Sequence, residues 1–264
     1  MFLKRYINIF KTIVSLTISR SRTFLADTLI GLFTNIIFVV ANVLFWLFVF
    51  RSGYNIGGWS LSDIIVFLAF SELFFGIDNA IFKAASRFWY YIVSGMLDIH
   101  LTRPFDPRLR FILFNISYTT IIKTIIVFIT LLLIANAKLN IILVLIGVII
   151  VIIANVILAF ITSVLNYLSF IFGRLDAVSE ISDSMVMFNK YPLVVMPKGL
   201  IYIFKFTLPF FFFSTFSAEL VTSKLTSTDL IISISGLILC LCLWYLLNKY
   251  FWRKGLSRYE SYNG

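Results

Sequence analysis

Residues 141–172 read IILVLIGVIIVIIANVILAFITSVLNYLSFIF and contain no charged side chain. A helix that crosses the hydrocarbon core of a bilayer needs about 20 consecutive, mostly apolar residues. This run is longer, so it predicts a transmembrane helix that tilts or projects past the membrane. Four further apolar runs also predict spans, at 27–50, 61–82, 111–135 and 230–251.

The bulk composition agrees with a membrane protein. Of the 264 residues, 61% are hydrophobic and 13% are charged, whereas soluble proteins average about 45–50% and about 25%. The net charge of +10 comes from basic residues in short segments between the apolar runs. Such a distribution indicates contact with membrane headgroups, so no nucleic-acid partner is expected.

The first 26 residues predict an N-terminal interfacial helix. Their apolar residues recur at steps of three and four, with basic residues off that face, which is typical of a helix lying along a membrane surface. They lack the pattern of a cleavable signal. We therefore expect an all-α polytopic protein, with this helix at 1–26 and a six-helix transmembrane domain at 27–264.

The fifth span in chain order has two candidates. Hydropathy favours 200–216, but 174–195 could cross instead as an amphipathic helix shielded by a partner. In that case 200–216 becomes a re-entrant or outer hairpin broken at Pro209, a backbone tolerated only when protein or water surrounds it.

The distribution of Lys and Arg sets the orientation. With the N-terminus inside and the span at 200–216, 17 basic residues lie inside and three outside. With the span at 174–195, the numbers become 15 and five. Both arrangements put both termini in the cytoplasm, and the predicted location is a prokaryotic inner membrane.

Several kinds of catalytic site are missing from the sequence. There is no G-x-x-x-x-G-K-[ST] loop for nucleotide phosphates and no H-E-x-x-H or Cys/His cluster for a metal. His100 is the only histidine. We expect no cofactor or metal on this chain and no catalytic residue.

The segment between the second and third predicted spans contains a short amphipathic helix. Leu97, Leu101 and Phe105 share one face, and Pro104 and Pro107 end the helix. Such a helix could dock into a groove on a soluble partner. The alternative is an amphipathic turn lying on the lipid headgroups.

These residues carry a resemblance to a known family. The G-x-L-D-x-x-L-x-R-P run from Gly95 to Pro104 resembles a hallmark of one branch of the ABC type-2 export permeases. So do Tyr191-Pro192, followed by Leu208-Pro209, and the C-terminal run from Trp252 to Ser261. The order and spacing of these motifs are similar across nearly the whole chain.

The resemblance implies a dimer of permeases, the same or sister chains, above two copies of a cytoplasmic ABC ATPase that binds ATP and Mg²⁺. It implies a coupling helix at about 94–103 and an interfacial connecting helix at about 2–20. It also implies an outer hairpin at about 197–215, which favours 174–195 as the fifth span. The ATPase-coupling residues would be Gly95, Leu97, Asp98, Leu101, Arg103 and Pro104.

Charged residues at membrane depth are candidates for a translocation path. Glu72 and Lys123 both reach the middle of their spans and could meet, either as a structural pair or at the substrate. Asp176, Glu180 and Asp183 form an acidic stripe at helical spacing. The stripe favours a cationic amphiphile as cargo if it lines a wet path; the alternative is a solvated acidic face.

Two further classes of protein compete with the export permease. An ion-coupled secondary transporter or channel would need a coupling-ion site, for which Glu72, Asp78 and Lys123 are the available residues. An intramembrane enzyme lacks paired histidines, a fitting Ser/Lys dyad and metal ligands.

Overall fold

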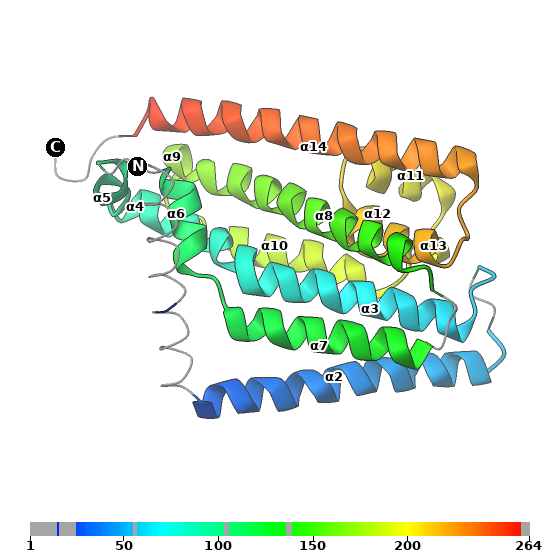
Figure 1. The fold of residues 1–264 in the computed structure, drawn as a ribbon. Helices are drawn as coiled ribbons and strands as arrows, with labels where there is room; N and C mark the ends of the chain where they lie inside the picture. Colours follow the sequence, from blue (N-terminus) through cyan, green and yellow to red (C-terminus); the bar gives the residue numbers. More distant parts are fainter. Residues whose placement is uncertain (1–14, 16–24, 55–56, 103–105, 136–138, 260–264) are drawn as a thin grey trace.

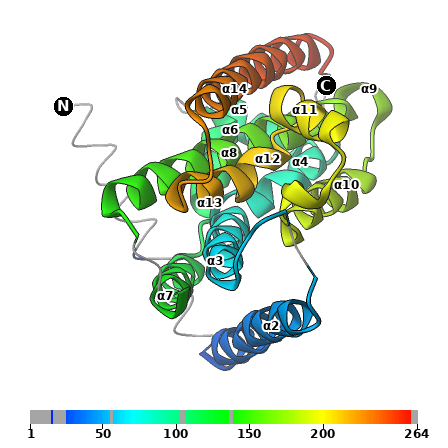
Figure 2. The ribbon, with the colours of Figure 1, turned by 90° about the vertical axis from the view of Figure 1, so that its right-hand side faces the viewer.

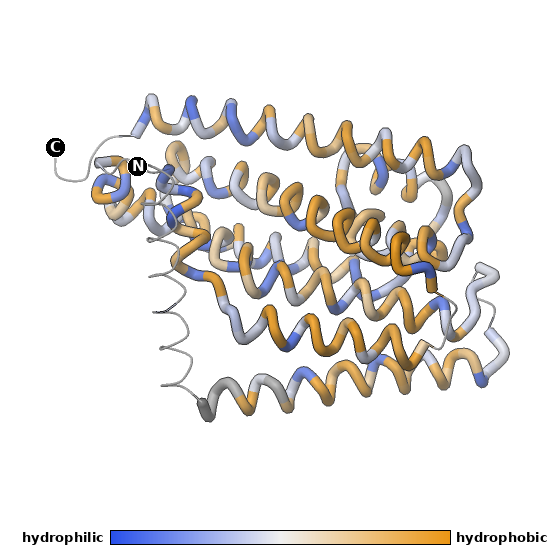
Figure 3. The backbone as a smooth tube through the Cα atoms, in the orientation of Figure 1, coloured by the Kyte–Doolittle hydropathy of each residue, from blue (hydrophilic) through white to orange (hydrophobic). Residues whose placement is uncertain are grey.

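The computed structural model describes residue 15 and residues 25–54, 57–102, 106–135 and 139–259, and all the regular structure in them is helical (Figure 1). Five stretches are long and apolar enough to cross a membrane, and hydrophobic residues predominate along them (Figure 3). They are Leu29–Arg51, Leu61–Val93, Tyr118–Ala135, Ile141–Phe172 and Ser227–Leu256. The expected all-α polytopic fold is therefore confirmed.

Helix α3 (Leu61–Ile77) is the centre of the bundle. It begins with a capping box in which the Ser60 and Asp63 side chains each accept a hydrogen bond from the other residue's amide. All its residues from Ile64 to Ser71 are buried, because α7 (Tyr118–Ala135), α8 (Ile141–Tyr167) and α13 (Thr215–Val221) pack around it. A helix that is apolar all round is expected in such a position.

Beyond α3 the chain stays helical but irregular. A π-helical turn at Asp78–Phe82 and a 3₁₀ turn at Lys83–Arg87 lead into α4 (Phe88–Val93). The second apolar stretch thus extends past its predicted end at residue 82. Helix α5 (Leu97–Leu101) follows, and it lies at the same end of the bundle as α4 (Figure 1). We call this the α5 end.

The predicted third span, 111–135, is wrong at its start. Helix α6 (Pro107–Phe114) ends there, and α7 begins only at Tyr118. The break is stabilised by hydrogen bonds, because the Ser117 amide donates to the Ala80 carbonyl and the Ser117 hydroxyl accepts from the Thr120 amide. The spanning helix is therefore shorter than the apolar run.

Neither candidate for the remaining span forms one long helix. In the segment 174–195, α10 (Ala177–Met187) follows α9 (Ser169–Phe172), and two 3₁₀ turns, Phe188–Lys190 and Leu193–Val195, follow α10. This segment runs antiparallel to the chain around α3. Ser179 hydrogen-bonds to Ser86 near one end, and Ser71 to Asn189 further along. The chain thus passes once along the bundle here, away from the α5 end (Figure 1).

The segment 200–216 is a hairpin whose second half, from Pro209, is buried in the bundle. It comprises α11 (Lys198–Phe206), α12 (Phe210–Phe213) and the start of α13, with the break around Pro209. The Trp244 indole donates to the Thr207 carbonyl over 2.9 Å, and the Ser217 hydroxyl donates to the Gly147 carbonyl over 3.0 Å. Protein buries the chain from Pro209 onward, whereas Thr207 just before the break is exposed.

Helix α2 (Leu25–Arg51) lies at the edge of the bundle, and α14 (Ser227–Leu256) lies across its opposite side (Figure 2). Most large apolar side chains of α2 from Leu29 onward are exposed, so lipid or a partner must cover them. The predicted N-terminal interfacial helix, 1–26, falls outside the described residues except at 15, 25 and 26.

Candidate functional site

The α5 end contains an aromatic cluster that joins six helices. We call it the end cluster. Helices α4, α5, α6, α8 and α14 all contribute to it, together with α9 and the residues after α14. Its buried members are Phe88, Ile92, Leu97, Phe111 and Tyr167, and Phe170, Phe251, Trp252 and Tyr259 are among the partly buried residues around them.

The one buried side chain of helix α5, Leu97, packs into the end cluster. Gly95 has φ +72°, a conformation that favours glycine, and it turns the chain into α5. Leu97 is 0% exposed and packs inside the end cluster. Met96 and Ile99 are 42% and 59% exposed. The helix is therefore anchored from within and presents apolar side chains outward.

The predicted docking face of this helix is divided. Leu97 is buried inside the protein, while Leu101 is 38% exposed, so these two residues cannot form one surface for a partner. The sequence pattern shows which residues share a face but not which neighbour covers it. Arg103 and Pro104 lie outside the described residues.

Asp98 faces the C-terminal segment. Burial raises the pKa of the Tyr259 phenol to about 12, and the neighbouring Asp98 carboxylate also raises it. The Tyr259 ring lies 5.7 Å from the ring of Phe170 in α9. The residues after α14 are thus connected to α5 and α9.

Arg108 in α6 connects the same region to α14. Its Nε lies 2.9 Å from Asp106 Oδ1 and its Nη2 lies 2.5 Å from Asp106 Oδ2. Burial alone would raise the pKa of the Asp106 carboxyl, but the Arg108 guanidinium and nearby amides outweigh burial and lower it. Arg108 Nη1 also donates to Asn248 over 3.3 Å, and the guanidinium lies 4.8 Å from the Trp252 ring centroid.

Asn166 stabilises the irregular chain between α3 and α4. Its side-chain amide donates to the carbonyls of Ala85 and Thr162, and its oxygen accepts from the Trp89 amide over 2.7 Å. Asn166 is completely buried. One α8 side chain therefore satisfies backbone groups that the 3₁₀ turn leaves open.

The end of α14 packs tightly against α9. A β-carbon at Gly255 would lie 2.2 Å from Phe170, so only glycine fits there without movement. Trp252 lies within 5.2 Å of Tyr167 and 6.1 Å of Phe170, measured between ring centroids. A displacement of α5 would therefore be transmitted through the end cluster to α8, α9 and α14.

The two charges predicted at membrane depth interact electrostatically, but they do not form one of the ion pairs of the described residues. The Glu72 carboxylate interacts with the Lys123 ammonium and hydrogen-bonds to Asn35. These contacts connect α3 with α7 and α2. Lys123 also borders a groove of about 410 Å³ between α2 and α7, whose other lining residues include Ile36 and Leu131.

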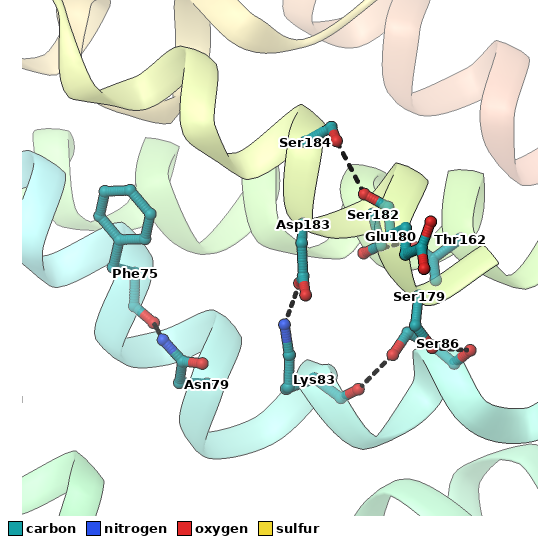
Figure 4. A network of polar contacts seen from close by, with 10 residues as sticks. All are labelled: Phe75, Asn79, Lys83, Ser86, Thr162, Ser179, Glu180, Ser182, Asp183 and Ser184. Atoms are coloured by element: carbon teal, nitrogen blue, oxygen red, sulfur yellow. Dashed lines mark hydrogen bonds and ion pairs between the residues drawn. The ribbon is translucent and has the colours of Figure 1, made fainter. Parts of the chain in front are cut away.

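The predicted acidic stripe does not act as one unit. Asp183 forms an ion pair with Lys83, while Glu180 points away from Lys83 (Figure 4). Asp176 pairs with Arg174 at 2.5 Å. Two of the three carboxylates are thus neutralised within the protein, and Glu180 is exposed.

The comparisons identify the family. Within the described residues, no group of His, Cys, Asp or Glu side chains could hold a metal ion. The family described as "ABC-2 family transporter protein" matches residues 36–263. This chain belongs to the ABC-2 transporter family. No curated protein and no solved structure matches this ABC-2 chain significantly.

Family membership establishes the class of the protein. ABC-2 chains are membrane permeases of ABC transporters, so this is a multi-pass permease, and the predicted recognition is confirmed. Permeases of this kind generally work with ABC ATPase partners. The role of each residue in the α5 end remains a prediction.

Sequence reasoning missed several residues of this ABC-2 permease. Arg108, Asn166 and Tyr167 lie at the α5 end, although no motif singled them out. Trp252 and Tyr259 belong to the C-terminal motif, yet the motif alone gave no contact for them. The one available signal was Asn166, which lies near the end of the apolar run 141–172. An asparagine in such a run needs hydrogen-bond partners from other helices.

Proposed function

We propose that this permease exports its cargo from the cytoplasm, driven by ATP hydrolysis on two copies of a separate ABC ATPase that binds ATP and Mg²⁺. A second permease chain, the same or a sister, completes the path. The chain itself performs no catalysis. The excess of Lys and Arg in the predicted inside segments supports a prokaryotic inner-membrane location with both termini and α5 in the cytoplasm.

The observation that carries this proposal is that α5 has both exposed apolar side chains and one buried side chain. Ile99 and Met96 present exposed apolar surface beyond the bundle, which suits a groove on a soluble partner. Leu97 fixes the same helix to the end cluster. A movement of the ATPase would thus reach the spans through Leu97, with Gly95 and Asp98 setting the position of α5.

Two routes lead from α5 to the membrane-spanning helices. One passes through Arg108 to Asn248 and Trp252 in α14. The other passes through α4 and the 3₁₀ and π-helical turns to α3. π-Helical turns often occur at functional positions because they weaken the regular hydrogen-bond ladder. We propose that this segment bends when α5 moves.

The acidic stripe gives limited support to a cationic amphiphile as cargo. Because Asp176 and Asp183 are paired, Glu180 is the carboxylate of the stripe that is open to a cation. The Glu180→Gln variant should slow export of a cationic amphiphile if Glu180 contacts cargo. Unchanged export would rule out this role.

The experiment that tests the function is co-purification with a candidate ABC ATPase partner. The permease should bind the ATPase and change its hydrolysis rate. Ile99→Asp should weaken both effects, because it places a charge in an apolar contact. Tyr54→Asp is the matched control, since Tyr54 is exposed beyond α2, away from α5.

The alternative is an ion-coupled secondary transporter. The electrostatic interaction between Glu72 and Lys123 is the observation in its favour, because opposite charges at membrane depth often mark ion pathways. That function predicts transport in vesicles driven by an ion gradient without any ATPase. Glu72→Gln should then abolish transport.

A further inference from the structure

We infer that a pocket at the α5 end binds the phosphate group of an acidic phospholipid. The pocket has a volume of about 530 Å³ and lies between the 3₁₀ turn, α4, the end of α6 and the region around α10. Its lining includes two basic side chains, three neighbouring aromatic ones and an amide: Lys83, Arg87, Trp89, Tyr90, Tyr91 and Asn115.

The charged residues that line the pocket are Lys83, Arg87 and Asp176, so the lining itself carries one cation in excess. Lys83 is paired with Asp183, as Figure 4 shows, and Asp176, which also lines the pocket, is paired with Arg174. Arg87 is exposed and forms no ion pair with any acidic residue in the described part of the chain. A guanidinium binds a phosphate through two parallel hydrogen bonds, so the pocket suits a phosphate monoanion or diester.

The depth of the pocket matches the lipid headgroups. Counted from Leu61 at about 1.5 Å per residue, Lys83 lies roughly 33 Å along the chain of helices and Arg87 roughly 39 Å. The hydrocarbon core of a bilayer is about 30 Å thick. Arg87 therefore lies beyond the core, in the layer where lipid phosphates are found.

The aromatic lining favours a lipid over a free phosphate. Trp89 and Tyr90 lie edge to face with ring centroids 6.0 Å apart, and Tyr90 is half-exposed. Tyr91 continues this series, with its ring centroid 6.4 Å from that of Tyr90. Trp and Tyr concentrate at the membrane interface, where their rings contact the glycerol and upper acyl region. A basic pocket among such rings at a helix end fits a headgroup.

This inference is independent of the ATPase, so it can be tested on the permease alone. Purified permease would be titrated with phosphatidylglycerol, and bound lipid would be counted by native mass spectrometry. Phosphatidylcholine with the same acyl chains tests for charge, and glycerol phosphate tests for a soluble ligand. Arg87→Gln should weaken phosphatidylglycerol binding about tenfold, which corresponds to about 1.4 kcal/mol.

Two further variants separate charge from fold. Arg87→Lys keeps the charge and should recover part of the binding. Arg253→Gln removes one exposed positive charge from α14 and should leave binding unchanged. Equal binding by Arg87→Gln and the wild type would overturn the inference. Displacement of the lipid by equimolar glycerol phosphate would also overturn it, because the site would then select a free phosphate.

Discussion

Replacing Arg108 by Gln should loosen the connection between α6 and α14. The substitution removes the guanidinium that contacts Asp106, Asn248 and the Trp252 ring, while the remaining side chain stays polar and of similar length. The matched control is Arg253→Gln, because Arg253 is exposed on α14. Both variants lose one positive charge, so a difference between them reports the contacts of Arg108.

The size of the effect follows from three contacts. The ion pair with Asp106 is about one-third exposed, so after screening by solvent it contributes about 0.5 kcal/mol. The cation–π contact with Trp252 adds roughly 0.5–1 kcal/mol. Asn248 is buried and loses a hydrogen-bond donor, which costs about 1 kcal/mol. The expected loss is about 2 kcal/mol, or roughly 4–8 °C in the unfolding temperature.

Thermal unfolding in detergent measures the stability of each variant. Permease-dependent ATPase activity of the complex then measures coupling at a temperature where both variants are folded. We expect Arg108→Gln to reduce that activity and Arg253→Gln to retain it. If both variants unfold at the same temperature and couple equally well, Arg108 does not connect α5 to α14 and this reasoning is refuted.

Two further predictions concern the packing of the bundle. Gly76→Ala should destabilise the protein by about 1–3 kcal/mol in thermal unfolding, because its β-carbon would lie 1.9 Å from Thr124 Oγ1 in α7. Gly31→Ala is the control, since nothing lies within 4 Å of the added carbon, and unfolding of both variants at one temperature would contradict the close packing of α3 and α7. Asn189→Leu should cost about 1–2 kcal/mol in the same assay, because it leaves the buried Ser214 hydroxyl without its acceptor. Wild-type stability of Asn189→Leu would show that this hydrogen bond does not hold the hairpin.

The sequence predicted the elements that depend on local composition. The runs at 27–50, 141–172 and 230–251 correspond closely to α2, to α8 with α9, and to α14, because length and apolar content alone decide whether a helix can span. The prediction of a span at 111–135 was wrong at its start. Its break at Asn115–Ser117 interrupts an apolar stretch with only two polar residues, and the break depends on a distant partner, Ala80.

The candidate site was also predicted only in part, because its contacts depend on residues from other parts of the chain. Helical spacing grouped Leu97 with Leu101, but the burial of Leu97 depends on Phe88, Phe111 and Tyr167, which are distant in sequence. An interaction between Glu72 and Lys123 was predicted as possible from depth alone, because both residues reach the middle of their spans. The pairing of Asp183 with Lys83 depends on the path of α10, which hydropathy left open.

The most direct test of the central claim is the ATPase activity of the reconstituted complex. The rate of the ABC ATPase would be measured alone, with wild-type permease and with Ile99→Asp permease, using Tyr54→Asp as the control. The account predicts that wild-type and Tyr54→Asp permease bind the ATPase and alter its rate, whereas Ile99→Asp loses most of that effect while unfolding at the wild-type temperature. An ATPase that neither binds the permease nor responds to it would contradict the account.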